Sequence, residues 1–314
     1  MCDGWKPLML VIGLSALGVM SPRAAGQASL SEHPVNETLP YRVIPDFFQL
    51  PRGENFVEVA GIAVNSQGHI YVFHRGKHPL MEFDEAGKFV RSIADDLFLI
   101  PHSVRVDAHD NIWTVDNGTH VVVELSPEGR VLLALGKFKV PGADWAHFNQ
   151  PTDVAMDRDG NIFVVDGYVN MRIVKYDHNG NFVLAWGMEG SGEGQFETPH
   201  SIAIDGDVVY VADRENSRIQ IFDRNGRFVR QWTGIGHPFG LFVTPDHFVW
   251  VCDGYAGRIL KLAANGTIVG TFTEPDGHGP EGRADPHQLW VAKDGAIYVA
   301  EVINWRPRKF LLQK

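Results

Sequence analysis

Three histidines in the chain have the same local sequence and could together bind a metal ion. His102, His200 and His287 each follow a proline, in the phrases Pro-His-Ser-Val, Pro-His-Ser-Ile and Pro-His-Gln-Leu. They lie in the second, fourth and sixth copies of an internal repeat. If six copies close into a ring, alternate copies lie about 120° apart and the imidazoles meet on the central axis. Three imidazoles with one open coordination position form the ligand set of a catalytic zinc site.

The alternative for any one of these histidines is a hydrogen bond to a neighbouring loop. Three histidines at one repeat position, in alternate copies only, favour the metal site instead. The other copies carry different residues at the aligned position, namely Gly61, Thr152 and Phe239. The histidine is therefore not a general feature of the repeat. The pattern predicts a metalloenzyme rather than a binding scaffold.

A second set of chemically useful side chains follows the second strand of the repeat. Arg75, Tyr168, Arg214 and Tyr255 occupy this position in different copies. In an antiparallel sheet the end of strand two lies on the same face as the start of strand one, so these side chains are expected at the mouth of the histidine site. An arginine fork matches a carboxylate, and a tyrosine beside a metal can act as a base. Ion pairs on the surface or between blades are the alternative for the arginines.

Acidic residues recur just before these positions. Because they occur in copies with and without a histidine, we expect a structural role, accepting hydrogen bonds from turn amides. The residues are Asp116, Asp166, Asp213 and Asp253.

The repeat itself predicts the fold. Prolines at positions 101, 151, 199, 238 and 286 introduce the second to sixth copies, with spacings of 50, 48, 39 and 48 residues, and a period of this size is typical of a propeller or solenoid. Short β-branched and aromatic runs alternate with turn signals such as Asp159-Gly160 and Asn179-Gly180. The sequence thus predicts an all-β, six-bladed β-propeller with four strands in each blade.

The two ends of the repeat region indicate how the ring closes. The sixth copy ends after its third strand, at residues 309–314, while residues 41–48 form an extended segment that precedes the first copy. Open sheet edges invite incorrect pairing. We therefore expect the N-terminal segment to supply the fourth strand of the last blade.

Composition and the N-terminus limit the function classes. A formal net charge of −10 without a basic stripe argues against a nucleic-acid partner.

Residues 1–26 combine Lys6, an apolar run over 8–20 and small residues, as in a secretory signal peptide. We expect a secreted or periplasmic protein without stable membrane insertion, an uncleaved anchor being the alternative. Residues 27–40 are expected to be a flexible lead-in, and residues 41–314 a monomeric propeller. Cys252, the one cysteine after cleavage, is expected to be buried and inert.

Several phrases resemble the peptidyl-α-hydroxyglycine α-amidating lyases, which are six-bladed propellers of the NHL-repeat type. The resemblance covers roughly residues 55 to 305 and is more specific than the general NHL phrase. The phrases that carry it are Val72-Phe-His-Arg-Gly76, Gln150-Pro-Thr-Asp-Val-Ala155, Val165-Asp-Gly-Tyr-Val-Asn170, Pro199-His-Ser-Ile-Ala203 and Val211-Ala-Asp-Arg-Glu-Asn216.

This resemblance implies roles for particular residues. It places zinc on His102, His200 and His287, and makes Tyr168 the proposed base. It implies that Arg75 contacts the substrate and that Arg214 lies in the same pocket. The implied reaction cleaves a peptidyl-α-hydroxyglycine into a peptide amide and glyoxylate.

The sequence departs from the family in places. The animal enzymes carry an aspartate after the third histidine, and it helps to hold a calcium ion with backbone carbonyls. Here that residue is Gln288, a neutral and weaker ligand, so a calcium site at Ile62, Val104 and Gln288 is only a secondary expectation. Asp285 replaces a methionine two residues before the histidine and adds a negative charge near the metal.

Two other functions fit the fold. A metal-dependent propeller hydrolase or lactonase would also hold a metal on the axis, although that class usually binds calcium through carboxylates and an asparagine. A non-catalytic NHL binding module would present its face to a protein or glycan and hold no tight metal. Metal analysis of the purified protein separates these classes.

Overall fold

The computed structural model describes residues 37–277, 282 and 284–313. The predicted signal peptide, residues 1–26, lies outside the described residues, as does the predicted lead-in up to residue 36. No helix in the described part of the chain is long and apolar enough to cross a membrane.

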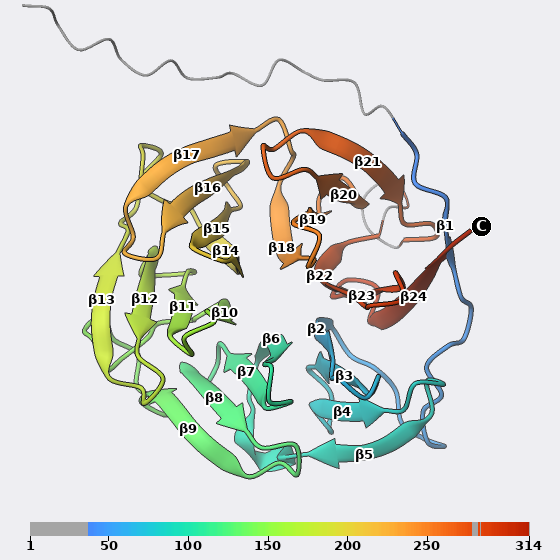
Figure 1. The fold of residues 1–314 in the computed structure, drawn as a ribbon. Coiled ribbons are helices and arrows are strands. Elements are labelled where there is room, and N and C mark those ends of the chain that lie inside the picture. The colour runs from blue at the N-terminus through green and yellow to red at the C-terminus, as the bar shows by residue number, and fades with distance from the viewer. Residues whose placement is uncertain (1–36, 278–281, 283, 314) are drawn as a thin grey trace, which may run out of the picture.

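Six four-stranded antiparallel sheets surround a central axis, so the predicted six-bladed propeller is confirmed (Figure 1). In each blade the first strand lies nearest the axis and the last at the rim. The first three blades are β2 (Val59–Val64), β3 (Ile70–His74), β4 (Leu80–Phe83) and β5 (Phe89–Ile93); β6 (Pro101–Val106), β7 (Ile112–Asp116), β8 (Val121–Leu125) and β9 (Val131–Gly136); and β10 (Asp153–Met156), β11 (Ile162–Asp166), β12 (Arg172–Tyr176) and β13 (Phe182–Trp186). The others are β14 (Pro199–Asp205), β15 (Val208–Asp213), β16 (Arg218–Asp223) and β17 (Phe228–Thr233); β18 (Pro238–Val243), β19 (Val249–Asp253), β20 (Arg258–Leu262) and β21 (Ile268–Thr273); and β22 (Pro286–Val291), β23 (Ile297–Glu301), β24 (Arg306–Leu312) and β1 (Tyr41–Val43). A 3₁₀ turn, η1 (Asp95–Leu97), precedes the second blade.

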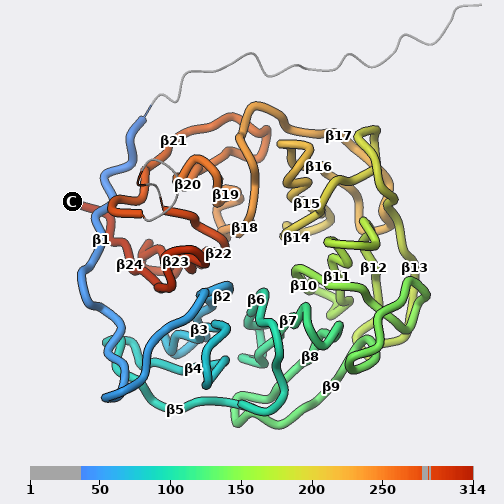
Figure 2. The backbone as a smooth tube through the Cα atoms, turned by 180° about the vertical axis from the view of Figure 1, so that it is seen from behind, coloured from blue at the N-terminus to red at the C-terminus, as the bar shows by residue number. Residues whose placement is uncertain are grey.

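The N-terminal strand closes the ring as predicted. β1 pairs antiparallel with β24, placing Tyr41 opposite Leu312, so the chain's first and last strands share a blade (Figure 2). The segment around β1 also touches both neighbouring blades, because Thr38 pairs with Thr271 and Gln49 pairs with Lys88. The closing segment therefore bridges three blades at the rim.

Tight turns join the strands where the sequence predicts them. Gly160 and Gly180 have φ values of +79°, a conformation that costs a side-chain-bearing residue energy and that glycine adopts freely. In the first of these turns, Oδ1 of Asp157 accepts the backbone N–H groups of Asp159 and Asn161. This local bonding fixes the hairpins that present each strand to its neighbour.

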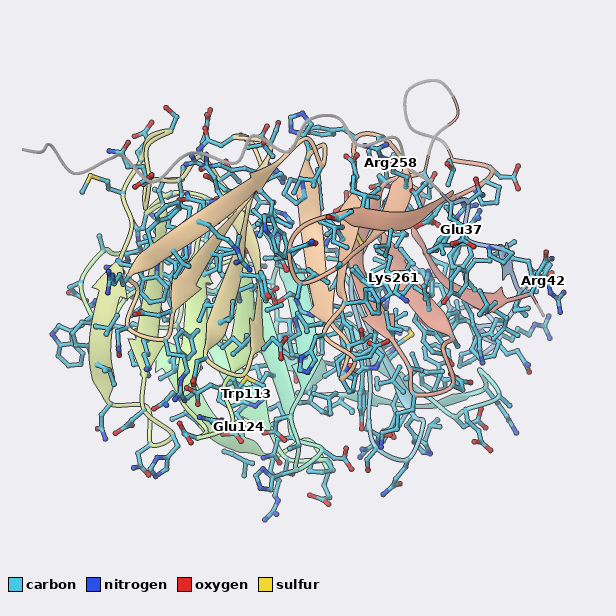
Figure 3. The ribbon with its side chains drawn as sticks, turned by 45° about the horizontal axis from the view of Figure 1, so that its top comes forward. Glu37, Arg42, Trp113, Glu124, Arg258 and Lys261 are labelled. Carbon is cyan, nitrogen blue, oxygen red and sulfur yellow. The ribbon has the colours of Figure 1, made fainter. Side chains whose placement is uncertain are left out.

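The hydrophobic core is divided into six clusters, one between each pair of neighbouring blades. One cluster, for example, joins Tyr210 and Trp232 of the fourth blade to Leu241 and Leu260 of the fifth. Figure 3 shows the side chains that fill these spaces between the sheets. Because apolar packing between neighbouring blades stabilises the ring, the side chains on the central axis can be polar.

Candidate metal centre

The three histidines lie at β-bulges on the innermost strands. In the second blade Pro101 pairs with Asp116 and Ser103 with Val115, so His102 between them is an extra residue. The same shift surrounds His200 and His287. A bulge redirects the extra residue's side chain. The bulge therefore explains how a residue at the start of a strand comes to face the axis.

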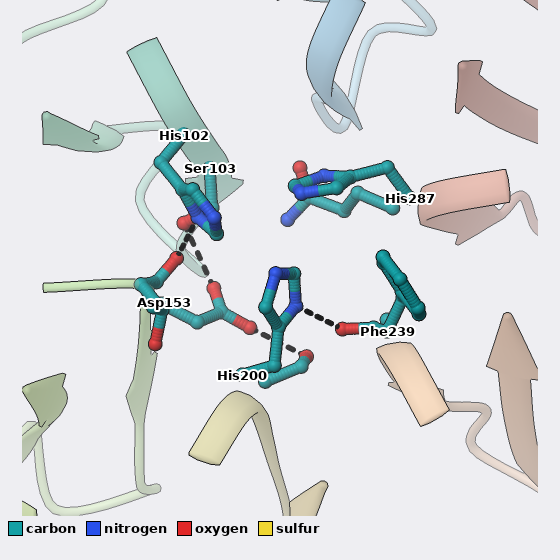
Figure 4. Close-up of a pocket in the computed structure, with 10 residues that line it drawn as sticks. His102, Ser103, Asp153, His200, Phe239 and His287 are labelled. Atoms are coloured by element: carbon teal, nitrogen blue, oxygen red, sulfur yellow. Dashed lines mark hydrogen bonds between the residues drawn. The ribbon is translucent and has the colours of Figure 1, made fainter. Parts of the chain in front are cut away.

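The strands bring the three imidazoles together. One ligand nitrogen from each of His102, His200 and His287 lies within 4.8 Å of the other two, and each pair of ring centroids is 4.8 Å apart. The side chains converge from three different blades (Figure 4). Their residues are 1%, 2% and 7% exposed, respectively. This cluster could hold a metal ion.

Each histidine is oriented by a backbone carbonyl of the next blade. The Nδ1 atoms of His102, His200 and His287 lie 2.5, 2.7 and 2.7 Å from carbonyl oxygens. A carbonyl only accepts, so each Nδ1 carries the proton and each Nε2 keeps its lone pair for a metal. The carbonyls belong to Thr152, Phe239 and Ala60.

The register of the first blade corrects the sequence alignment by one residue. Val59 pairs with His74 and Gly61 with Phe73, just as Pro101 and Ser103 pair in the second blade. Ala60, and not Gly61, is therefore the counterpart of the histidines. The alignment was wrong because no proline marks the first copy. With this correction, every histidine bonds the carbonyl at the matching position of the following blade.

Burial keeps the imidazoles neutral. Desolvation lowers the pKa of His102 and of His200 well below the usual range, and the neighbouring His287 and Arg214, respectively, lower them further. Desolvation also lowers the pKa of His287 to about 3. A neutral imidazole is the form that binds metal. The site is therefore in the ligand form at neutral pH.

The Tyr168 hydroxyl faces the histidine cluster. Its oxygen lies 3.1 Å from Nε2 of His102 and 3.2 Å from Nε2 of His200. The backbone N–H of Tyr168 donates to the carbonyl of Gln150 at 3.3 Å. The loop after β11 thus places a phenol within hydrogen-bond distance of two candidate metal ligands.

Both predicted arginines lie at the mouth, and both form ion pairs. Arg75 donates from Nη1 to Glu58 at 2.8 Å and from Nε to the carbonyl of Pro101, the residue before the first histidine. Arg214 donates to Glu215 at 2.8 Å. Its guanidinium also lies 4.7 Å from the ring centroid of Phe239 and 5.6 Å from that of Tyr168. Both arginines therefore form the ion pairs that the sequence offered as their alternative role, and both lie beside the histidine cluster.

Other sequence candidates lie farther from the cluster or serve structure. Tyr255 is exposed and donates to Glu215 at 3.3 Å. Asp285 accepts the backbone N–H of Ile303, and burial raises its pKa to about 6. Burial also raises the pKa of the Cys252 thiol, which suits an inert side chain.

The recurring aspartates bond the backbone of the preceding loop. Asp116, for example, accepts the N–H groups of Leu99 and Ile100, both at 2.9 Å, and that of Thr119. Asp166, Asp213 and Asp253 accept N–H groups of the loops before their blades in the same way. These carboxylates therefore hold the loops that frame the mouth.

Gln288 does not fit a calcium site with Ile62 and Val104. Its Oε1 accepts the N–H groups of Ile62 and Val104 at 3.0 and 3.3 Å, while its Nε2 donates to the carbonyl of Val104 at 3.2 Å. Two N–H donors require the oxygen to face them, so the amide orientation is set by its partners. The amide N–H group then points at the carbonyl oxygen of Val104. A calcium ion bound to that carbonyl would need an oxygen of residue 288 at this place, and it would meet an N–H donor instead.

A buried polar network below the histidines was missed in the sequence. The guanidinium of Arg105 donates to both carboxylate oxygens of Asp153, which also accepts from the hydroxyls of Ser103 and Ser201. The cavity between this network and the histidines has a volume of about 10 Å³. That is room for one water-sized species. The sequence does show a serine directly after His102 and after His200. It does not show that both serine hydroxyls bind the same carboxylate, that of Asp153.

Comparison with known proteins agrees with this architecture. An NHL repeat model matches residues 148–176 and 196–222. Among solved structures, a streptogramin B lyase aligns with a TM-score of 0.62 at 15% identity, covering 87% of this chain and 98% of its own. A gluconolactonase from Xanthomonas campestris aligns with a TM-score of 0.63 at 15% identity, covering 82% and 87%. At such identities these structures support the propeller fold alone.

Sequence relatives carry the resemblance further. The chain is 33% identical over 173 residues to a probable peptidyl-alpha-hydroxyglycine alpha-amidating lyase of Caenorhabditis elegans, covering 47% of this chain and 49% of that protein. It is 36% identical over 179 residues to the peptidylglycine alpha-amidating monooxygenase of Rattus norvegicus, covering 47% of this chain and 18% of that protein. The matched region thus spans half or less of these relatives. The resemblance to the amidating lyases is confirmed.

Proposed function

We propose that this protein is a zinc-dependent lyase that cleaves the C–N bond of a peptidyl- or acyl-α-hydroxyglycine, releasing an amide and glyoxylate. The observation that carries the proposal is the convergence of three neutral, buried imidazoles with the Tyr168 hydroxyl at one mouth. Imidazole nitrogens suit Zn²⁺, and three such ligands leave a position open for substrate. Curated relatives named as amidating lyases support the same chemistry.

A zinc ion on His102, His200 and His287 would supply Lewis acidity to the substrate hydroxyl. Tyr168, in its phenolate form, would take the hydroxyl proton; its oxygen lies within hydrogen-bond distance of two of the Nε2 atoms, which supports this role. The electrons of the O–H bond then form the carbonyl of glyoxylate while the C–N bond breaks. The departing amide nitrogen receives the proton that Tyr168 took from the hydroxyl, so atoms and charge balance and the base is regenerated.

The arginines at the mouth are suited to the substrate carboxylate. A guanidinium binds a carboxylate through two parallel hydrogen bonds. Arg75 is held beside the first histidine by its bond to the carbonyl of Pro101, and Arg214 is held against the rings of Phe239 and Tyr168. Either position would orient the hydroxyl-bearing carbon toward the imidazoles. The substrate carboxylate would replace Glu58 or Glu215 as the partner of its arginine, or would bind the guanidinium together with that glutamate.

The test is a product analysis with a short substrate. Zinc-loaded protein is incubated with N-acetyl-α-hydroxyglycine, and acetamide and glyoxylate are quantified by NMR against a protein-free control. Equal amounts of both products, formed faster than in the control, are expected. A zinc-loaded protein that forms neither product but hydrolyses lactones or esters would support the hydrolase alternative. A protein that retains no metal and shows no turnover would support the binding module.

The predicted signal peptide adds a location to the proposal. A secreted or periplasmic lyase would meet hydroxyglycine substrates outside the cytoplasm. Comparing the N-terminus of the mature protein with residues 1–26 of the sequence tests this part.

A further inference from the structure

A cleft lies beside the candidate metal centre and shares two residues with it. It has a volume of about 500 Å³, and its wall includes both Arg75 and Tyr168. These are two of the residues assigned to the reaction. The cleft is therefore continuous with the candidate site, and a substrate held there would extend into it.

The wall of this cleft also carries two exposed apolar side chains. Leu99 is 56% exposed and Ile100 is 41% exposed, and both line the cleft. Leaving large apolar side chains in water is unfavourable unless something covers them. The remaining wall is polar or small, and consists of Asn117, Gly118, His120 and Gln150.

The backbone that carries these apolar side chains is held in a defined position. The buried carboxylate of Asp116 accepts the N–H groups of both Leu99 and Ile100 at 2.9 Å, and the N–H of Asn117 donates to the carbonyl of Ile100. Gly118 lies directly beneath them, since a Cβ at this position would meet side-chain atoms of both at 2.9 Å. The wall is therefore built in advance of binding, which lowers the entropic cost of covering it.

We propose that Leu99 and Ile100 form a subsite for an apolar N-acyl group or an apolar penultimate side chain of the substrate. This inference rests on the proposed function and names the substrate class that the site prefers. The polar head of the substrate, its hydroxyl and carboxylate, lies at the histidines and arginines. The apolar tail lies on the Leu99–Ile100 wall.

The test compares N-hexanoyl-α-hydroxyglycine with N-acetyl-α-hydroxyglycine on the zinc-loaded protein. The longer chain has four more methylenes, and each, if half buried on the wall, contributes about a factor of two. We therefore expect kcat/KM to be roughly 15-fold higher for the hexanoyl substrate. In a Leu99→Ser/Ile100→Ser variant the ratio should fall toward one, and Gly118→Ala should lower it by displacing both side chains.

Val131→Ser is the matched control. Val131 is 55% exposed on β9 of the same blade and does not line the cleft, so this variant should keep the wild-type ratio. A wild-type ratio near one, or a ratio unchanged in the double variant, would overturn the subsite while leaving the lyase function intact.

A binding measurement separates this outcome from failure of the lyase itself. N-Hexanoylglycine and N-acetylglycine lack the hydroxyl and cannot be cleaved, so calorimetry measures their affinities without turnover. Tighter binding of the hexanoyl compound, lost in the double variant, would support the subsite even if no glyoxylate is released. Equal affinities would overturn the subsite.

Discussion

Replacing Gln288 tests whether a side-chain amide, and not calcium, joins the blades on the axis. Gln288→Ala removes three hydrogen bonds and leaves the N–H groups of Ile62 and Val104 without that acceptor in a buried site. A buried donor that loses its partner costs about 1–3 kcal/mol. Two such donors predict a loss of about 3 kcal/mol in the free energy of unfolding.

Gln288→Glu is the informative companion, because it keeps the shape and one acceptor oxygen. Its second oxygen replaces Nε2 and faces the carbonyl of Val104, so the ionised form is repelled. The repulsion and burial should raise the folded-state pKa of the introduced carboxyl above its unfolded value. At low pH the protonated carboxyl can donate to the Val104 carbonyl, so the variant should lose little of the wild-type free energy of unfolding. This loss should grow as pH rises through that pKa.

Both variants are measured by urea unfolding, with and without calcium, using tryptophan fluorescence. The wild-type midpoint should not change with calcium, because a ligand stabilises a protein only if it binds the folded state. Calcium should raise the midpoint of Gln288→Glu, which presents a charged oxygen beside the Val104 carbonyl. A wild-type protein that calcium stabilises, or a Gln288→Ala variant that loses less than about 1 kcal/mol, would refute this explanation.

Four further outcomes are expected. His200→Ala should lose bound zinc, measured by atomic emission, and all glyoxylate release, while circular dichroism stays that of the propeller, since the blades bury their own cores. Tyr168→Phe should keep its zinc but lose roughly 10²- to 10⁴-fold in kcat, the usual cost of a lost general base, whereas Tyr255→Phe serves as the control. Arg75→Ala should raise KM, lower kcat or both, and so lower kcat/KM. Converting the substrate carboxylate to an amide should lower the kcat/KM of wild type by a similar factor, but should lower that of the variant little further. Burial lowers the pKa of His74 to about 4, below its unfolded value near 6.5, so stability should be greatest above pH 6.5 and fall as pH drops toward 4. His74→Asn should flatten that part of the stability profile in urea titrations.

The outcomes that contradict these expectations are equally definite. Zinc retained by His200→Ala would exclude the axial site, and an unchanged kcat in Tyr168→Phe would assign the base to another group. Full activity on the substrate amide would remove the need for an arginine at the mouth. A pH profile that does not differ between wild type and His74→Asn would show that this histidine is not buried as a neutral group.

The sequence predicts the fold well because each blade repeats a pattern that can be read locally. Turn pairs such as Asp159-Gly160 mark the hairpins, and the prolines before the inner strands mark the copies. The pairing of β1 with β24 was also predictable, since the last copy lacks one strand. Only the first copy was misaligned, where no proline stands before Ala60.

The site was predictable in its residues but not in its contacts. Repetition identifies the three histidines, but it does not reveal the bulges that aim them at the axis or the carbonyls that fix their tautomer. Pairing between blades is also invisible to one sequence, as the Arg105–Asp153 ion pair shows. The Leu99–Ile100 wall was missed because exposed apolar residues are common, and only Asp116 and the cleft distinguish this pair.

A zinc titration with activity as the readout tests the central claim most directly. Metal-free protein is prepared with a chelator and returned to zinc in steps, while glyoxylate release from N-acetyl-α-hydroxyglycine is followed. Activity should rise linearly and reach a plateau at about one zinc per chain, as three histidines of one site require, and His200→Ala should stay inactive throughout. Activity that persists without metal, or that rises equally in His200→Ala, would contradict a catalytic zinc ion on the propeller axis.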